Sequence, residues 1–320
     1  MKTKLLIASL GFAISAGATA ADSQSWPTKP VRVIVPSAPG GGLDTTARIV
    51  AQQLSQQLGQ PFVVENKPGA GTTIGNREIV RSPADGYTLL FNTPTFIISQ
   101  QVYSDLPYER DDFLPLALVT TTPMVMITSP KSGFKTLDDY IQAAKANPEH
   151  ISYSSSGSGS TPHLGFEMLQ NSAGIELLHV PFKGGGEAIT AVIAGTTDTY
   201  LATPIEVRDR VNAGQLVALG TTGTERAQSM PDVPTLYESG LTDYELVHFL
   251  AVLVNSDTPP EIVEKLSANI VQALQAPEVR DKLSQSGDVP AGTLEEATEM
   301  FERAYPMWTK VVELANIQPN

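Results

Sequence analysis

Two loops rich in glycine and serine hold the residues best suited to binding a small anion. The first covers residues 37–44 and follows Val31–Val35, which is predicted to form a short buried strand; the second covers residues 155–163 and follows a predicted strand at 151–154. Glycine leaves main-chain N–H groups open to a ligand. A loop that enters a helix also presents unpaired N–H donors at the positive end of the helix dipole. The pattern predicts that the two loops hold one carboxylate between them.

Polar residues at two further strand ends extend this candidate site. Thr93 follows an apolar run that ends at Phe91, and Thr203-Pro204 follows the run at 198–202. In open α/β sheets, ligands bind beyond the carboxyl ends of the strands. Hydrogen bonds to a charged group contribute roughly 1.5–3 kcal/mol each, so four nominally exceed the roughly 8 kcal/mol of micromolar binding without a side-chain cation. The expected ligand-binding residues are Ser37, Gly40, Gly41, Gly42, Asp44, Thr93, Ser156, Gly157, Gly159, Ser160, His163, Thr203 and Pro204.

Four ionisable residues near these loops have competing interpretations. Asp44 is expected to accept hydrogen bonds from backbone N–H groups and to fix the loop, because its charge would repel a carboxylate; a direct contact would be with a ligand amine or a water. His163 is equally consistent with a structural hydrogen bond and with a ligand contact. Lys183 is either a point charge in the cleft or an ordinary surface lysine. Glu206 would favour a cationic group if it points inward.

Other chemistries are weakly supported. The spacing G-x-G-x-x-x-G over Gly69–Gly75 resembles a dinucleotide loop, but no later acidic residue is placed for a ribose, so a loop beside the cleft is the preferred interpretation. The histidines lack the spacing of a metal site. A G-x-S-x-G elbow is absent, although a hydrolase using a serine from 154–160 with His163 stays as an alternative. We therefore expect no cofactor, no metal and no catalytic residue.

Charge and the first residues indicate an exported protein. A formal net charge of −13 argues against nucleic acid as a partner, because binding a phosphate backbone requires a basic surface. A small anion is not excluded, since exposed charges are screened over about 8 Å at physiological salt. Lys2 and Lys4 precede an apolar run over residues 5–16, too short to span a bilayer, and Ala18-Thr19-Ala20 matches a cleavage pattern. We expect a signal peptide over residues 1–20, cleaved near Ala20.

The order of predicted elements indicates an α/β fold with two domains. Strand and helix patterns alternate over residues 31–91 and again over 151–220, which predicts parallel sheets flanked by helices. The runs at 116–128 and 247–254 are predicted to cross between the domains, and paired crossing strands suit hinge closure. The expected division is residues 21–124 for the first part of domain 1, 125–246 for domain 2, and 247–320 for the return to domain 1.

Several segments, taken in order, resemble one known family. They are Trp26–Pro30, Val35–Asp44, Val64–Gly71, Pro83–Leu90, Gly157–Leu164, His179–Gly184 and Met230–Thr235. Together they resemble the periplasmic solute-binding receptors of tripartite tricarboxylate transporters, the Bug-type proteins, over essentially the whole mature chain. The resemblance implies a periplasmic-binding-protein clamshell of the type II kind, whose two mostly parallel sheets are joined by two crossing strands.

The resemblance also implies a function. Such receptors close on a small carboxylate, a di- or tricarboxylate, an acidic amino acid or an aromatic acid, and deliver it to membrane permease subunits. Residues 37–44 and 157–163 correspond to the two gripping elements, the first acting partly through ordered waters. The chain departs from the family pattern at Ser37, usually aromatic, and over residues 196–206, usually more apolar. We expect a monomeric periplasmic receptor; a sensor that signals to a membrane kinase is the alternative.

Overall fold

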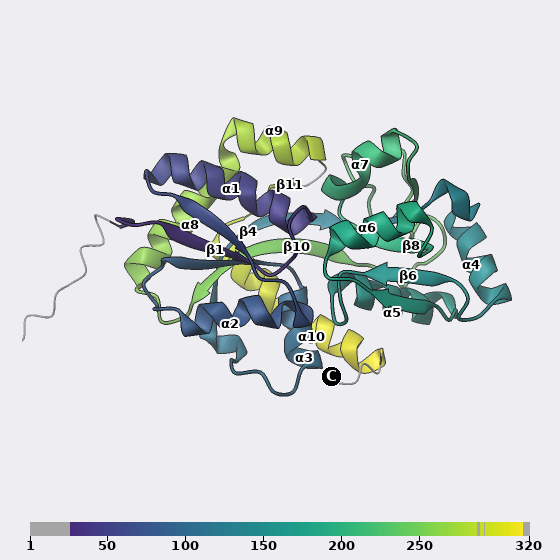
Figure 1. Ribbon diagram of the computed structural model, residues 1–320, viewed down its shortest axis with the longest axis horizontal. Coiled ribbons are helices and arrows are strands. Elements are labelled where there is room, and N and C mark those ends of the chain that lie inside the picture. The colour runs from purple at the N-terminus through teal and green to yellow at the C-terminus, as the bar shows by residue number, and fades with distance from the viewer. Residues whose placement is uncertain (1–25, 287–288, 291, 316–320) are drawn as a thin grey trace, which may run out of the picture.

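The computed structural model of the chain has two α/β domains set side by side (Figure 1). It describes residues 26–286, 289–290 and 292–315. The signal peptide predicted over residues 1–20 lies outside the described residues. In the part of the chain that is described, no helix is both long enough and apolar enough to span a membrane.

The first domain is built on a six-stranded sheet with the order β11-β4-β10-β3-β1-β2. Its strands are β1 (Val31–Val35), β2 (Phe62–Asn66), β3 (Thr88–Asn92), β4 (Phe113–Pro123), β10 (Val247–Asn255) and β11 (Val289–Pro290). β1 lies parallel to β2 and β3, whereas β10 runs antiparallel between β3 and β4.

Helices cover both faces of this sheet (Figure 1). The helices are α1 (Gly42–Leu58), α8 (Pro260–Gln275) and α9 (Pro277–Ser286) on one side, and α2 (Thr73–Arg81), α3 (Thr95–Val102) and α10 (Leu294–Leu314) on the other. Val31, Val33 and Val35 pack in the cluster that includes α1 and α8, while Ile34 packs in the cluster that includes Trp308. Because both faces are buried, β1 is apolar except for Arg32, whose guanidinium group pairs with Glu65 and Glu78.

The second domain repeats this plan with a five-stranded sheet in the order β7-β6-β8-β5-β9. Its strands are β5 (Val125–Thr128), β6 (Ser152–Ser155), β7 (Leu178–Pro181), β8 (Thr199–Ala202) and β9 (Val217–Thr221). Its helices are α4 (Leu137–Ala146), α5 (Thr161–Ala173), α6 (Gly185–Ala194) and α7 (Pro204–Asn212). Val125 packs with the cluster of α6 and α7, and Met126 packs with that of α4 and α5. Short 3₁₀ turns lie at Ala70–Thr72, Arg110–Asp112 and Pro130–Ser132.

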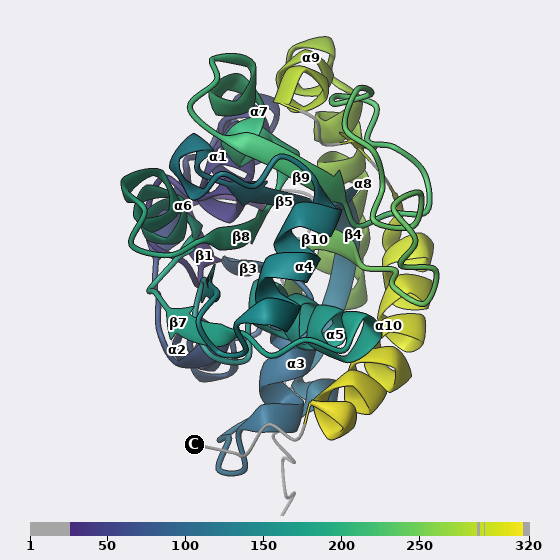
Figure 2. The same ribbon diagram turned by 90° about the vertical axis from the view of Figure 1, so that its right-hand side faces the viewer.

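Strands β4, β5 and β10 connect the two domains. Only Met124 separates β4 from β5, and β10 returns beside β4 with Val247 paired to Pro123 and Asn255 paired to Phe113. In Figure 2, β10 and β4 lie side by side behind the second domain. The expected two-domain α/β fold is confirmed. Both sheets are mixed, because the crossing strands add antiparallel pairs to the parallel strands β1–β3 and β6–β8. The numbered domain bounds stay a prediction.

Leu201 provides a test of the second core. It is fully buried on β8, and its Cδ1 atom lies against Gly165 of α5. Leu201→Ala should lower the free energy of unfolding by about 2–5 kcal/mol, because the cavity left in a packed core collapses only partly. Leu178→Ala, on the exposed strand β7, is the matched control and should stay within about 0.5 kcal/mol of the wild type. Urea denaturation measures both; equal losses would contradict the assignment of Leu201 to the core.

Candidate functional site

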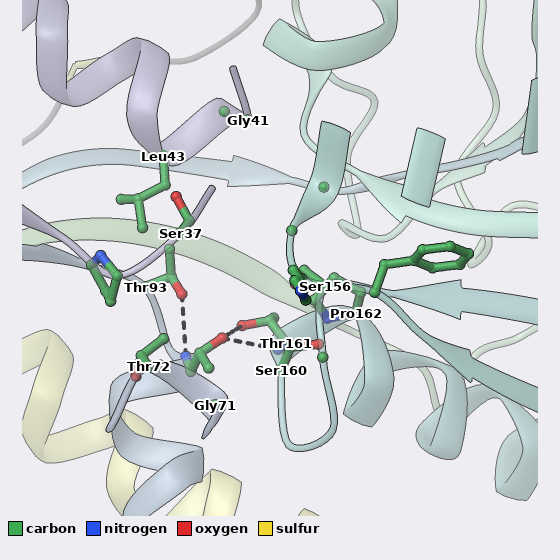
Figure 3. Close-up of a pocket in the computed structure, with 18 of the residues that line it drawn as sticks. Ser37, Gly41, Leu43, Gly71, Thr72, Thr93, Ser156, Ser160, Thr161 and Pro162 are labelled. Atoms are coloured by element: carbon green, nitrogen blue, oxygen red, sulfur yellow. Dashed lines mark hydrogen bonds between the residues drawn. The ribbon is translucent and has the colours of Figure 1, made fainter. Parts of the chain in front are cut away.

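A cavity of about 320 Å³ lies between the two domains, at the carboxyl ends of the parallel strands of both sheets. Figure 3 shows Ser37, Leu43 and Thr93 on one side of it, and Ser156, Ser160 and Pro162 on the other. The lining residues are Pro36, Ser37, Gly41–Leu43, Gly69–Thr72, Thr93, Thr95, Tyr103, Met124, Ser156–Ser158, Ser160–Pro162, Phe182–Gly185, Tyr200, Thr203, Glu206 and His248.

The structure brings most of the predicted site residues to this cavity. Those that line it are Ser37, Gly41, Gly42, Thr93, Ser156, Gly157, Ser160 and Thr203. Those that do not are Gly40, Asp44, Gly159, His163 and Pro204. Lys183 and Glu206, whose orientation the sequence left open, both line it.

The first loop joins β1 to α1, and Asp44 holds its shape. Gly40, at a φ of +86°, adopts the left-handed conformation that favours glycine. Its N–H donates to Asp44 Oδ2 over 2.9 Å, and Arg48 Nε and Asn66 Nδ2 donate to the same carboxylate. Burial raises the pKa of Asp44, but the hydrogen bonds from Arg48, Gly40 and Asn66 outweigh it and hold the pKa below its usual value. The interpretation of Asp44 as the residue that fixes the loop is confirmed.

The second loop joins β6 to α5 and is braced by two histidines. Ser155 Oγ lies 2.7 Å from His179 Nε2, and the N–H of Gly159 donates to His163 Nδ1 over 3.0 Å. The sequence left two interpretations of His163 open, a structural hydrogen bond and a ligand contact, and the structure shows the hydrogen bond. The N–H of Thr161, the first residue of α5, donates across the cleft to Thr95 Oγ1 over 3.1 Å.

Glu206 makes a second contact across the cleft. It is the third residue of α7, and its Oε2 accepts hydrogen bonds from the N–H and the hydroxyl of Thr203, both at 2.9 Å, in a capping box. Its Oε1 accepts a hydrogen bond from the N–H of Gly42, the first residue of α1, over 2.9 Å. Glu206 therefore occupies one of the N–H groups that the sequence assigned to a ligand.

Several donors of the cavity-lining residues are left without a partner. Among residues 26–286, which the structure describes, five main-chain N–H groups of the cavity-lining residues in the two loops form no hydrogen bond, and two hydroxyl groups there are buried and unpaired. They are the N–H groups of Ser37, Gly41, Leu43, Ser156 and Ser158, and the hydroxyls of Ser37 and Ser160. They come from both domains, so an acceptor in the cavity can be reached from two sides.

Comparison with known proteins places this arrangement in one family. Residues 46–311 match the model of the tripartite tricarboxylate transporter family receptor. The chain belongs to this receptor family. It is 31% identical to the protein BugT of Bordetella pertussis over 94% of each chain. Among solved structures, Rpa4515 of R. palustris with adipate is 29% identical, with a TM-score of 0.88 over 92% of this chain and 100% of that one. MatC of Rhodopseudomonas palustris with bound malate is 27% identical, with a TM-score of 0.85 over 90% of this chain and all of that one.

The alternative of a serine hydrolase finds little support in this receptor. The serine next to an imidazole is Ser155, and its partner is His179, not His163. Ser155 is fully buried and is not among the residues that line the cavity. Burial also lowers the pKa of His179 to about 4, which makes it a weak base at neutral pH. The contact therefore braces the loop.

The sequence missed part of the receptor's cavity wall. Tyr200 and Phe182 flank the second domain's loops, Tyr103 follows α3, and Met124 and His248 come from the crossing strands. The crossing strands were predicted, but their apolar pattern does not say which side chain faces the cleft. The Gly69–Thr72 segment does lie at the cavity, in agreement with its interpretation as a loop beside the cleft.

The buried histidines predict how the receptor's stability depends on pH. Burial lowers the pKa of His163 to about 3, with a smaller contribution from His179 beside it, and lowers that of His179 and of His248 to about 4. In the unfolded chain a histidine titrates near 6.5. Between about pH 6.5 and pH 4 the unfolded state therefore binds more protons, and stability falls as pH falls, by up to about 1.4 kcal/mol per pH unit for each histidine.

His163→Asn isolates one of these groups. An asparagine can still accept the hydrogen bond from Gly159 but takes up no proton, so the fall in unfolding free energy between pH 6.5 and pH 4 should become shallower. Urea denaturation at a series of pH values measures it. His150→Asn, at an exposed position, is the control and should keep the wild-type slope. An unchanged slope in His163→Asn would show that His163 is not part of the acid sensitivity.

Proposed function

We propose that this chain is a periplasmic receptor that captures a small carboxylate in the cleft between its domains and delivers it to the membrane permease of a tripartite tricarboxylate-type transporter. The observation that carries the proposal is the set of unpaired N–H and hydroxyl donors that two glycine loops bring to one cavity from opposite domains. In this proposal residues 1–20 direct export and are removed near Ala20, and the mature receptor acts as a monomer.

The donors suit a carboxylate for a simple energetic reason. A buried carboxylate needs several hydrogen bonds to replace its hydration, and bonds to a charged acceptor contribute roughly 1.5–3 kcal/mol each. The N–H groups of Gly41, Leu43, Ser156 and Ser158 provide four such donors. The hydroxyls of Ser37 and Thr93 lie on the same wall (Figure 3). Gly40, Asp44, Gly159, His163 and Pro204 support the loops in this proposal and do not touch the ligand.

Domain closure follows from the division of the donors. Each domain supplies some of the groups that bind the anion, so the ligand interacts with all of them only when the domains come together. A ligand can shift a conformational equilibrium by its differential affinity for the two states. The hinge at Met124 and the paired strands β4 and β10 allow this motion, and a permease can then recognise the closed receptor. The adipate and malate bound by two structural neighbours add support for a carboxylate ligand.

The direct test is the identity of the bound ligand. The receptor should be expressed with its export signal, purified from the periplasm without denaturation and examined by native mass spectrometry. A carboxylate released on unfolding, which raises the melting temperature when added back, is the expected result. Turnover of the compound during incubation would instead favour the hydrolase, and a set of carboxylates that leave the melting temperature unchanged would contradict the receptor.

Gly41 gives a mutational test. It precedes α1 at a φ of −79°, and a Cβ there would meet no atom closer than 3.7 Å, so a side chain fits the backbone. Gly41→Val places methyl groups over the unpaired donors and should abolish ligand-induced thermal stabilisation while unfolding stays cooperative. Gly41→Ala adds only the Cβ and should bind more weakly than the wild type. Normal binding by Gly41→Val would mean that the first loop does not hold the ligand.

A further inference from the structure

Glu206 introduces a fixed negative charge into a cleft proposed to bind an anion. Among the described residues that line the cavity, it is the one acidic side chain, and Lys183 is the one cationic side chain. His248 also lines the cavity, but burial lowers its pKa to about 4, so it is neutral near pH 7. The wall of the cavity therefore carries one charge of each sign.

The capping box does not account for both oxygens of Glu206. In the same motif at the start of α10, Glu296 Oε2 accepts the hydrogen bond from the N–H of Thr293, and within the described part of the chain its side chain forms no hydrogen bond with any other residue. Glu206 Oε2 likewise accepts the hydrogen bond from the N–H of Thr203. Its Oε1 takes no part in the capping box. Instead, it accepts a hydrogen bond from the N–H of Gly42 in the other domain.

The space around Glu206 is shaped to hold a carboxylate. Three helices begin around it: α1 at Gly42, α6 at Gly185 and α7 at Pro204. A Cβ atom at Gly42 would lie 3.2 Å from the Glu206 carboxyl carbon, and a Cβ atom at Gly185 would overlap Oε1. Helix N-termini attract negative charge. The protein's own carboxylate thus occupies the position where helix dipoles converge.

Because the Glu206 carboxylate already fills this position, it limits which charged groups of a ligand can bind beside it. A carboxylate has about four acceptor positions, and Gly42 and Thr203 use three of those of Glu206, so one stays open toward a donor. A second ligand carboxylate near this wall would meet a like charge and find the N–H of Gly42 already taken. An ammonium group would instead meet an opposite charge in a partly buried setting, where such pairs are strong.

We propose that Glu206 determines specificity, and that the cleft selects a zwitterion with one carboxylate and one ammonium group over a dicarboxylate. The inference rests on the proposed function. The ligand carboxylate binds the unpaired donors of Gly41, Leu43 and the second loop, and the ammonium group binds Glu206 Oε1. Lys183, the one cationic side chain among the described lining residues, is available to the ligand carboxylate.

Matched probes test the proposal. The six-carbon set is hexanoate, 6-aminohexanoate, norleucine and adipate, and the four-carbon set is butyrate, 4-aminobutyrate, 2-aminobutyrate and succinate. Calorimetry and thermal shift compare the wild type with Glu206→Gln, which keeps the shape but removes the charge. Glu296→Gln, which weakens the same capping motif far from the cleft, controls for the loss of a helix cap.

The expected result is that one of the amino acids binds the wild type at least about ten-fold more tightly than the dicarboxylate of equal length, and that Glu206→Gln loses most of this preference while Glu296→Gln keeps it. If no probe binds, the ligand identified by mass spectrometry decides, and an ammonium group in it supports the proposal. Tighter binding of a dicarboxylate or a simple monocarboxylate, or a native ligand without an ammonium group, overturns it but leaves the carboxylate receptor intact. If no carboxylate binds or co-purifies, both proposals fail.

Discussion

The antiparallel pairing of β10 with β4 is the constraint on which the rest of the structure depends. It runs from Val247 opposite Pro123 to Asn255 opposite Phe113, entirely within the first sheet. The chain therefore leaves and re-enters the first domain at one place, which is the position of the hinge in the proposed closure. Met124 and His248, at this junction, also contribute to the cavity wall. The same strands that hold the domains together thus position the two loops across the cleft.

At the first loop, the protein's own carboxylates bind some of the main-chain N–H groups and leave others unpaired. Asp44 takes the N–H of Gly40 and Glu206 takes that of Gly42, while the N–H groups of Gly41 and Leu43 between and beyond them stay free. The protein's own carboxylates thus shape the loop and leave a defined remainder for a ligand. The proposed anion site of a chain with a formal net charge of −13 therefore needs no cluster of basic residues.

Local signals were enough to predict much of this arrangement. Glycine and proline after a predicted strand located both loops, and the position of Asp44 in the first turn of α1 indicated its structural role. Contacts between distant segments were not predictable. Gly42 and Glu206 are 164 positions apart, and their hydrogen bond depends on how the domains meet. The partnership of Ser155 with His179 likewise needs the parallel pairing of β6 with β7.

The C-terminal helix α10 contacts both domains and carries a buried tryptophan. α10 packs on β4 and α3 in the first domain and also touches α5 in the second. Trp308 lies fully buried on this helix, and the whole chain contains two tryptophans. A rotation of the second domain relative to the first would alter the contact between α10 and α5. Intrinsic fluorescence of Trp308, with no dye attached, can therefore test whether the proposed domain closure alters the packing of this helix.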